Sequence, residues 1–351
     1  MKVLFLVRSS LYQNKGGDTV QVEETAAALR NLGVEVDVQL SNSRPRYAQY
    51  SLLHFFNCTR PQDFLSHVQA SGKPYVLSTI YVDDARPSSV LQNLVGTSVT
   101  AYLKAWGRWA KNGEEIVSRQ YLWLGHRRSI KKLLAGAAML LPNSENEYRR
   151  LQQDFGIEKE YAVVYNGVSS LFQPHASRQR IVNKVICVGR IEPLKNQLAL
   201  IRALNHTHYQ VYIIGAASTN HTNYLQQCRK EAGANIHFTG ALSQQELLQH
   251  YHTAGVHVLP SWFETTGLST LEAAACGCQV VIGKYGDAQE YVGNAAWVCD
   301  PALPHSIRQA VDAAAATPIS HELSAHVQQN FTWTKAAQRT LQVYQQVVQT
   351  A

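Results

Sequence analysis

The feature that most constrains the fold is an alternation of short β-branched runs with helix-forming segments, which occurs twice along the chain. Continuous apolar strands separated by helices are typical of parallel sheets covered on both faces. With 351 residues, 45% of them hydrophobic, the chain can build two separate cores. We therefore predict an α/β fold of two Rossmann-like, doubly wound parallel-sheet domains that face a cleft. The predicted strands lie in residues 2–7, 34–40, 50–57, 74–80, 137–143, 161–167, 184–190, 209–215, 236–240, 256–260, 279–283 and 295–300.

The boundary between the domains is predicted at residues 165–175, YNGVSSLFQPH, because Asn-Gly, paired serines and a proline interrupt the pattern. We therefore expect domains at residues 1–168 and 169–333. Residues 334–351 have the pattern of an amphipathic helix, which need not stay on the domain it follows. Further helices are expected at residues 19–32 and from Pro61 onwards.

The cysteines and the N-terminal residues suggest a compartment. The six cysteines form no CxxC pair, and several lie inside apolar runs, so they are predicted to be reduced core residues of a cytosolic protein. The first apolar run is only five residues long and is followed by Arg8, which is too short for a signal peptide or a membrane span. We expect a cytoplasmic protein, with peripheral contact at the inner face of an anionic membrane as a further expectation.

The net charge of +7 is concentrated in residues 86–132, where nine basic residues and two acidic ones accompany Trp106, Trp109 and Trp123. Basic residues interleaved with tryptophan suit an anionic membrane face or an acidic acceptor. The alternative is a helical insertion with tryptophans in its core and solvated basic side chains. No nucleic-acid recognition motif accompanies this segment, so no nucleic acid is expected as a partner.

Residues that directly follow strands are the candidates for a site, because doubly wound sheets bind ligands outside the carboxyl ends of their strands. In VGRIEPLKN, Arg190 and Lys195 can together neutralise a diphosphate. The alternative is that Arg190 pairs with Glu192 on a solvated loop. Near the N-terminus, Gly16 and Gly17 lie between the first strand and a helix, which is a weak signal for a phosphate loop on its own.

The stretch SWFETTGLSTLEAAACG offers a second candidate. Gly267 frees the backbone of steric limits, and the first-turn N–H groups of residues 268–270 form an anion site at the start of a helix. Beside it, Glu272 can accept hydrogen bonds from ribose hydroxyls, and Glu264 can reach a hexose. The alternative is that both acids are solvated. Among the histidines, His54 is the one that could face the cleft.

Several motifs together resemble the retaining glycosyltransferases of family 4, which have the GT-B fold. FETTGLSTLEAAACG is similar to the EX7E motif, VGRIEPLKNQ to the Arg/Lys diphosphate motif, KGGDTVQVEETAAAL to the glycine loop, and VVYNGVSSLFQP to the stretch before the hinge. The last helix is similar to one that crosses back onto the first domain. The resemblance implies transfer of a hexose, with retention, from a nucleotide diphospho-sugar to a saccharide or lipid-linked acceptor in cell-surface polysaccharide or glycolipid synthesis. It also implies that no cofactor or metal is needed.

The resemblance also assigns roles to residues. Tyr81 and Asp83 stand where many relatives carry a histidine that faces the donor sugar. The implied catalytic residues are Arg190, Lys195 and Glu264; the implied donor-binding residues are Gly16, Gly17, Gly189, Gly240, Thr266, Gly267, Leu268, Ser269 and Glu272; and the candidates for acceptor or membrane contact are Tyr81, Asp83, Trp106, Trp109, Arg127 and Arg128. Two rival functions share this architecture, a sugar-nucleotide epimerase and a non-catalytic nucleotide-sugar binding protein.

Overall fold

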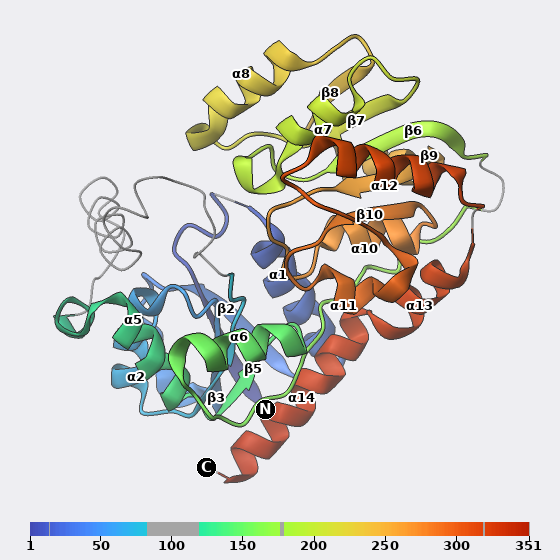
Figure 1. Cartoon of the computed structure of the whole chain (residues 1–351). Coiled ribbons are helices and arrows are strands. Elements are labelled where there is room, and N and C mark those ends of the chain that lie inside the picture. The colour runs from blue at the N-terminus through green and yellow to red at the C-terminus, as the bar shows by residue number, and fades with distance from the viewer. Residues whose placement is uncertain (14, 83–118, 176–178, 319, 351) are drawn as a thin grey trace. The chain divides into compact units, whose positions relative to one another are not determined.

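The computed structural model describes residues 1–13, 15–82, 119–175, 179–318 and 320–350. The chain divides into two compact units (Figure 1). The N-terminal unit comprises residues 1–165 and 333–351, and the C-terminal unit comprises residues 166–332. The observed boundaries lie three residues before the first predicted boundary and one residue before the second. The last helix therefore belongs to the unit that contains the start of the chain.

The N-terminal unit is built on a five-stranded parallel sheet in the order β2-β1-β3-β4-β5. Residues 3–7 of the first strand are almost completely buried, which requires cover on both faces of the sheet. The strands are β1 Lys2–Val7, β2 Glu35–Leu40, β3 Leu52–Phe56, β4 Tyr75–Ser78 and β5 Met139–Leu141, and the helices are α1 Gly17–Asn31, α2 Leu65–Ser71, α5 Arg119–Gly136, α6 Glu145–Phe155 and α14 Trp333–Thr350.

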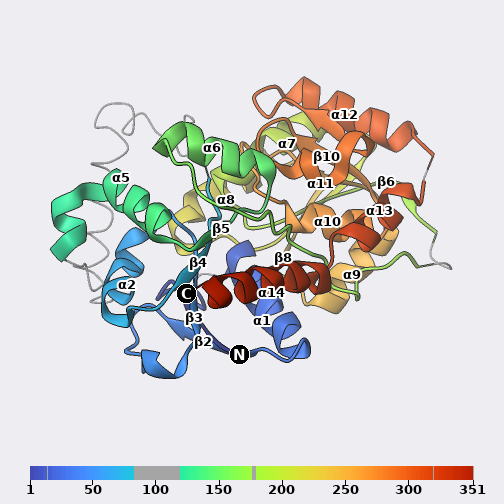
Figure 2. The same ribbon diagram turned by 90° about the horizontal axis from the view of Figure 1, so that it is seen from below.

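The helices of this unit divide between the two faces of the sheet. One face carries Leu4, Leu53 and Leu77, and they pack in one cluster with residues of α2, α5 and α6. On the other face α14 lies beside α1, as Figures 1 and 2 both show. Alternate strand residues therefore face different helices, as the pleat of a strand requires.

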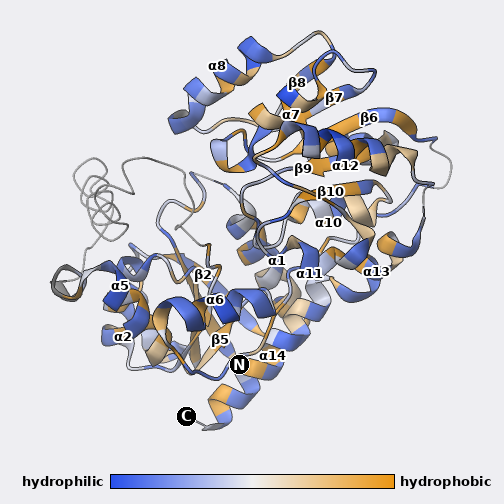
Figure 3. Ribbon diagram, viewed as in Figure 1, coloured by the Kyte–Doolittle hydropathy of each residue, from blue (hydrophilic) through white to orange (hydrophobic). Residues whose placement is uncertain are grey.

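The C-terminal unit has a six-stranded parallel sheet in the order β11-β10-β9-β6-β7-β8. Its strands are mainly hydrophobic, whereas the outer helix α8 is largely hydrophilic (Figure 3). The strands are β6 Ile181–Val188, β7 Gln210–Ile214, β8 Ile236–Gly240, β9 Ala254–Leu259, β10 Gln279–Gly283 and β11 Trp297–Cys299, and the helices are α7 Gln197–Leu204, α8 Thr222–Glu231, α9 Gln244–Thr253, α10 Leu268–Ala275, α11 Ala288–Val292, α12 Pro304–Ala316 and α13 Glu322–Asn330. The prediction of two doubly wound parallel sheets is confirmed.

Two local predictions are wrong. Residues 161–167 form no strand beyond a single bridge between Leu140 and Tyr161. The N–H of Val164 donates to the carbonyl of Pro142, but a proline has no N–H to continue the ladder. The helix expected from Pro61 begins instead as a 3-10 turn, Pro61–Asp63, and α2 starts at Leu65.

The buried thiols and His54 complete the cores. All six cysteines are buried and unpaired, which confirms them as core residues. His54 does not face a cleft: it is 1% exposed, and its Nδ1 lies 2.6 Å from the Tyr344 hydroxyl and its Nε2 2.9 Å from Ser78 Oγ. Burial lowers the pKa of His54 to about 3, so the ring is neutral at pH 7. Its role is to join β3 and β4 to α14.

Candidate functional site

The strand order of the C-terminal unit places its switch point between β6 and β9. The chain runs from β6 to β7 on one side and from β9 to β10 on the other, so the connections after β6 and β9 diverge. In doubly wound sheets, ligands bind at such a point, outside the carboxyl ends of the strands. The two segments that leave this edge are residues 189–196 and 260–267, which contain both motifs singled out from the sequence.

Hydrogen bonds tie these two segments together. The Ser269 hydroxyl donates to the carbonyl of Val188 at 2.9 Å, and the N–H of Trp262 donates to the carbonyl of Leu194 at 2.9 Å. Asn196, which adopts a left-handed conformation with φ 58°, donates its side-chain amide to the carbonyl of Pro260 at 3.2 Å. The loops after β6 and β9 therefore form one bonded structure.

The central contact is between Lys195 and Glu264. Nζ of Lys195 lies 2.5 Å from Oε1 of Glu264, and the two side chains are only 17% and 11% exposed. The Pro193–Lys195 turn sets the position of the lysine, and the loop after β9 sets that of the glutamate. An ion pair this far removed from water depends on both partners, because either charge alone would be poorly solvated.

Arg190 lies more openly at the same edge. Its side chain is 48% exposed, and its Nη2 lies 3.1 Å from Oε1 of Glu192. This pairing is the alternative that the sequence left open. The backbone carbonyl of Arg190 accepts a 2.9 Å hydrogen bond from the side-chain amide of Gln197. This bond fixes the backbone of Arg190, while its guanidinium stays half in solvent. The side chain of Glu192 is only 9% exposed, so the pair is open to solvent on the arginine side alone. An anionic ligand can reach the half-exposed guanidinium from that side and compete with Glu192 for it.

The start of α10 contributes backbone groups and a second carboxylate. Gly267 has φ 71°, a conformation that favours glycine, and its carbonyl accepts from the N–H groups of Thr270 and Leu271. The first N–H groups of a helix have no partner within the helix and favour an anion. Glu272, in the second turn of α10, accepts a 2.8 Å hydrogen bond from the Tyr251 hydroxyl.

A buried network holds the loop before Gly267, and of its three members only Thr266 was among the predicted site residues. The side-chain amide of Asn166 donates to the Thr266 hydroxyl at 2.9 Å, and its backbone N–H donates to the Tyr291 hydroxyl at 3.2 Å. All three residues are at most 5% exposed. Asn166 is also the first residue of the C-terminal unit, so the predicted boundary segment takes part in shaping the candidate site.

Two further glycines near the candidate site were not predicted from the sequence. A Cβ on Gly215 would lie 2.0 Å from the carbonyl oxygen of Gly189, and a Cβ on Gly286 would lie 2.2 Å from that of Glu264. Gly189, Gly215 and Gly240 stand in a row at the carboxyl ends of β6, β7 and β8. The N–H of Gly189 donates to the carbonyl of Ile214, and the N–H of Gly215 donates to that of Gly240. Glycine is required at residues 215 and 286 because of contacts between distant segments, so no local sequence pattern predicts it.

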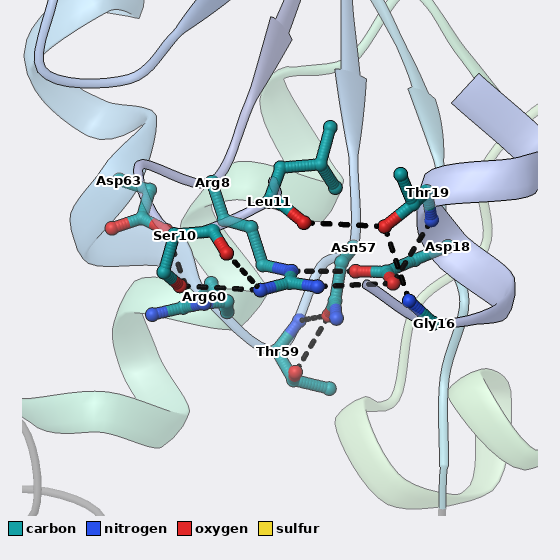
Figure 4. Close-up of polar contacts among 10 residues, drawn as sticks. All are labelled: Arg8, Ser10, Leu11, Gly16, Asp18, Thr19, Asn57, Thr59, Arg60 and Asp63. Atoms are coloured by element: carbon teal, nitrogen blue, oxygen red, sulfur yellow. Dashed lines mark hydrogen bonds and ion pairs between the residues drawn. The ribbon is translucent and has the colours of Figure 1, made fainter. Parts of the chain in front are cut away.

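The N-terminal unit has its own switch point. Its strand order places β1 next to β3, with the following connections running in opposite directions. Figure 4 shows the residues at this edge: Arg8 follows β1, Asn57 and Thr59 follow β3, and Gly16 precedes α1. The predicted glycine pair therefore lies at the carboxyl edge of this sheet.

The acceptor candidates are only partly described. Asp83, Trp106 and Trp109 lie outside the described residues. Tyr81 is largely buried against α6: its hydroxyl donates to Asp154 at 2.6 Å, and the residue is 9% exposed. A role for Tyr81 in acceptor contact stays a prediction. The exposed Arg127 donates to the Asp154 carbonyl, and Arg128 is also exposed on α5.

Membrane spans and metal clusters are both absent from the described part of the chain. None of the helices described is long and apolar enough to cross a membrane. Among the same residues, no group of three or more His, Cys, Asp and Glu side chains could hold a metal ion. The expected independence of metal stays a prediction.

The C-terminal unit is the part of the chain that matches the model of a known protein family. Residues 176–331 match the model of the family described as Glycosyl transferases group 1. Glycogen synthase from Mycobacterium tuberculosis is 31% identical over 199 residues, which cover 53% of this chain and 48% of that protein. D-inositol 3-phosphate glycosyltransferase from Streptomyces bingchenggensis is 28% identical over 245 residues, which cover 61% of this chain and 54% of that protein. The chain thus spans about half the length of the curated relatives it matches.

Solved structures show the fold of the whole chain. Sucrose-phosphate synthase from Thermosynechococcus elongatus has a TM-score of 0.76 at 18% identity, with 100% of both chains covered. HepE from Anabaena, solved in complex with UDP and glucose, has a TM-score of 0.71 at 16% identity, with 99% of this chain and 100% of that one covered. The solved structures show that the chain has the GT-B fold, and a glycosyltransferase family model matches its residues 176–331.

Proposed function

We propose that this protein is a retaining glycosyltransferase that transfers a hexose from a nucleotide diphospho-sugar to a saccharide or lipid-linked acceptor. The observation that carries the proposal is the meeting of Arg190, Lys195 and Glu264 at the switch point of the C-terminal sheet, beside the first turn of α10. Two cations, a carboxylate and helix N–H groups at one sheet edge suit a ligand that combines a diphosphate with a sugar.

The proposal gives each group a task. The diphosphate lies against Arg190, Lys195 and the N–H groups that follow Gly267, while Glu272 accepts from the ribose hydroxyls. Glu264 accepts from the hydroxyls of the hexose. Gly189 and Gly240 support this assignment, because strand ends without side chains let a nucleotide approach the backbone closely, and almost nothing lies within 4 Å of a Cβ at either residue.

The pairing of Lys195 with Glu264 suggests how the donor binds. In the unliganded protein the pair neutralises itself. When the donor arrives, its diphosphate supplies a second anion for Lys195 and its hydroxyls supply hydrogen-bond donors for Glu264, so neither charge is left unpaired. The cations already stand where negative charge will develop, and such preorganised charges often lower the barrier of an enzymatic reaction more than any other single effect.

The chemical step that we propose retains the anomeric configuration. The bond between C1 of the hexose and the diphosphate oxygen breaks through an oxocarbenium-like transition state, and Arg190 and Lys195 stabilise the charge on the departing diphosphate. The acceptor oxygen bonds to C1 on the same face, and its proton passes to the departing phosphate. No carboxylate base is required by this sequence of events.

The donor class is drawn from the comparisons. HepE chains similar in fold were solved with UDP or UDP-glucose, and one curated relative is named as a GDP-mannose-dependent mannosyltransferase. UDP-glucose and GDP-mannose are therefore the first donors to test. Synthesis of a polysaccharide or glycolipid in the cytoplasm, with contact at an anionic membrane, stays the proposed context.

The test is turnover by the full chain. Purified protein is incubated with UDP-glucose, GDP-mannose or ADP-glucose and with glycogen, D-inositol 3-phosphate or a polyprenyl-diphosphate-linked saccharide, and released nucleoside diphosphate is measured. We expect acceptor-dependent release from one donor, and a product with the anomeric configuration of that donor by NMR. An epimerase would convert the donor without acceptor-dependent release, and a binding protein would leave every donor intact; either result would contradict the proposal.

A further inference from the structure

The β1–α1 segment of the N-terminal unit is closed by one arginine. Nε and Nη2 of Arg8 lie 2.6 Å and 3.1 Å from the two carboxylate oxygens of Asp18, and Nη1 donates to the carbonyl and hydroxyl of Ser10 at 2.9 Å and 3.2 Å (Figure 4). The side chains of Arg8 and Asp18 are 12% and 20% exposed. A bidentate pair of this kind is among the stronger and more directional side-chain contacts, particularly when it is partly shielded from water.

Further hydrogen bonds link this pair to the glycines. The N–H of Thr19 donates to Asp18 Oδ1 at 3.0 Å, and the Thr19 hydroxyl donates to the carbonyl of Leu11 at 3.3 Å. The N–H of Gly16 in turn donates to the Thr19 hydroxyl at 3.2 Å (Figure 4). These contacts link the described residues on both sides of the segment, and the Arg8–Asp18 pair joins its two ends.

The neighbouring loop after β3 is organised differently. Asn57, with φ 81°, accepts hydrogen bonds from the N–H and hydroxyl of Thr59, and Arg60 pairs with Asp63 three residues later. These contacts span two or three residues, whereas Arg8 and Asp18 are ten residues apart. The longer contact closes a segment that includes two adjacent glycines, and glycine loses more conformational freedom on ordering than any other residue.

We propose that Arg8 is a positioning residue that holds the glycine segment in a single conformation for substrate. This inference rests on the proposed function, and it assigns a role that the sequence motifs do not contain. Arg8 acts through Asp18 and Thr19 on the backbone of Gly16 and Gly17. Because the segment is ordered before substrate arrives, the conformational entropy of the loop need not be lost when the reacting groups assemble.

The experiment measures loop order and turnover separately. Full-length Arg8→Gln, Asp18→Asn and the double variant are compared with wild type. Lys2→Gln is the matched control, because Lys2 lies at the other end of β1 from Arg8 and pairs with Asp37 of β2. Amide hydrogen exchange of residues 9–19 is followed by mass spectrometry. We expect about tenfold faster exchange there in each Arg8 and Asp18 variant, with the exchange of β3 and β4 unchanged.

Kinetics then connect loop order to function. With the donor that wild type turns over, each single variant is expected to lower kcat/KM about tenfold, and the double variant to lose no more than the single ones, because both remove one contact. Unchanged exchange in residues 9–19, additive losses, or faster exchange with unchanged kcat/KM would each overturn the proposal. If wild type turns over no donor, the proposed function fails, while the exchange rates still decide whether Arg8 orders the segment.

Discussion

Nζ of Lys195 lies 2.5 Å from Oε1 of Glu264, although the two residues are 69 positions apart in the chain. The loops after β6 and β9 meet at the switch point of the sheet, and this topology brings the two side chains together. Because the pair is so little exposed, removing the carboxylate of Glu264 also changes the environment of the Lys195 cation. Substitutions of the two residues are therefore expected to have different effects.

Glu264→Gln is expected to separate binding from chemistry. Lys195 loses its carboxylate partner and becomes more available to a diphosphate, so the affinity for the nucleoside diphosphate should be retained or should rise. Turnover of the donor should fall about a hundredfold, because the sugar loses an ionised hydrogen-bond acceptor. Calorimetry and steady-state kinetics measure the two effects. Glu231→Gln, which removes the partner of Arg202 in an exposed pair, serves as the control; equal losses of affinity and turnover in Glu264→Gln would contradict the assignment.

Gly286→Ala is expected to destabilise the protein by displacing the loop that carries Glu264. The new Cβ would lie 2.2 Å from the Glu264 carbonyl oxygen and 2.6 Å from its nitrogen, at a residue with φ 99°. The backbone must shift at residue 286 or at Glu264 to relieve this contact. We therefore expect the free energy of unfolding to fall by roughly 2 kcal/mol or more. Urea titration measures it. Gly293→Ala has φ 58° but nothing within 4 Å, so it should lose only about 1 kcal/mol; similar losses in the two variants would contradict the close contact.

Asn166→Ala is expected to loosen the loop before Gly267. Thr266 would lose the amide that donates to its hydroxyl at 2.9 Å, and a buried hydroxyl would be left with fewer partners. The expected cost is about 1–2 kcal/mol in unfolding free energy, together with weaker nucleotide binding. The partly exposed Asn183, which donates to the His208 carbonyl, provides the control variant Asn183→Ala. Nucleotide affinity that is the same in both variants would show that the network does not shape the site.

His257→Leu is expected to raise stability, most of all in acid. The ring is 0% exposed, and neither nitrogen has a hydrogen-bond partner among the described residues. Burial lowers its pKa to about 3, below the usual 6.5, so the unfolded chain takes up a proton between pH 6.5 and 3 while the native ring stays neutral. Stability therefore falls as the pH drops through this window, by roughly 2 kcal/mol between pH 7 and pH 5 from this ring.

The variant removes that dependence along with the buried polar atoms. Denaturant unfolding at pH 7 and pH 5 should show a smaller difference for His257→Leu than for wild type. The matched variant His237→Leu removes a partly exposed histidine that bonds Gln210, and it is the control for the loss of an imidazole ring. Equal slopes for wild type and His257→Leu would mean that His257 protonates alike in both states.

The sequence predicted the sheets well because local patterns suffice for them. The buried runs of β1 and β9 have the continuous hydrophobicity of strands covered on both faces, and the strand ends then identify where Arg190, Lys195 and Glu264 lie. The strand predicted at residues 161–167 failed because its partner segment contains Pro142, which the pattern of the predicted strand itself does not reveal.

The residues that were missed depend on contacts between distant segments. Gly286 must be glycine because of the backbone at Glu264, and Gly215 because of Gly189. Arg8 was noted only as the end of an apolar run, because its partner lies ten residues away across a loop whose shape the sequence does not give. Periodicity predicts elements, whereas the packing of one loop on another becomes visible only in three dimensions.

The most direct measurement is calorimetric titration of UDP, GDP, ADP and CMP into wild type and Lys195→Ala, in buffer that contains chelator. Arg202→Ala, which removes a cation from an exposed pair in the same unit, is the control. The account predicts that one nucleoside diphosphate binds wild type and Arg202→Ala with similar affinity, and binds Lys195→Ala at least about tenfold more weakly. Binding that Lys195→Ala leaves unchanged, or no binding of any of the four nucleotides, would contradict a diphosphate site at the switch point of the C-terminal sheet.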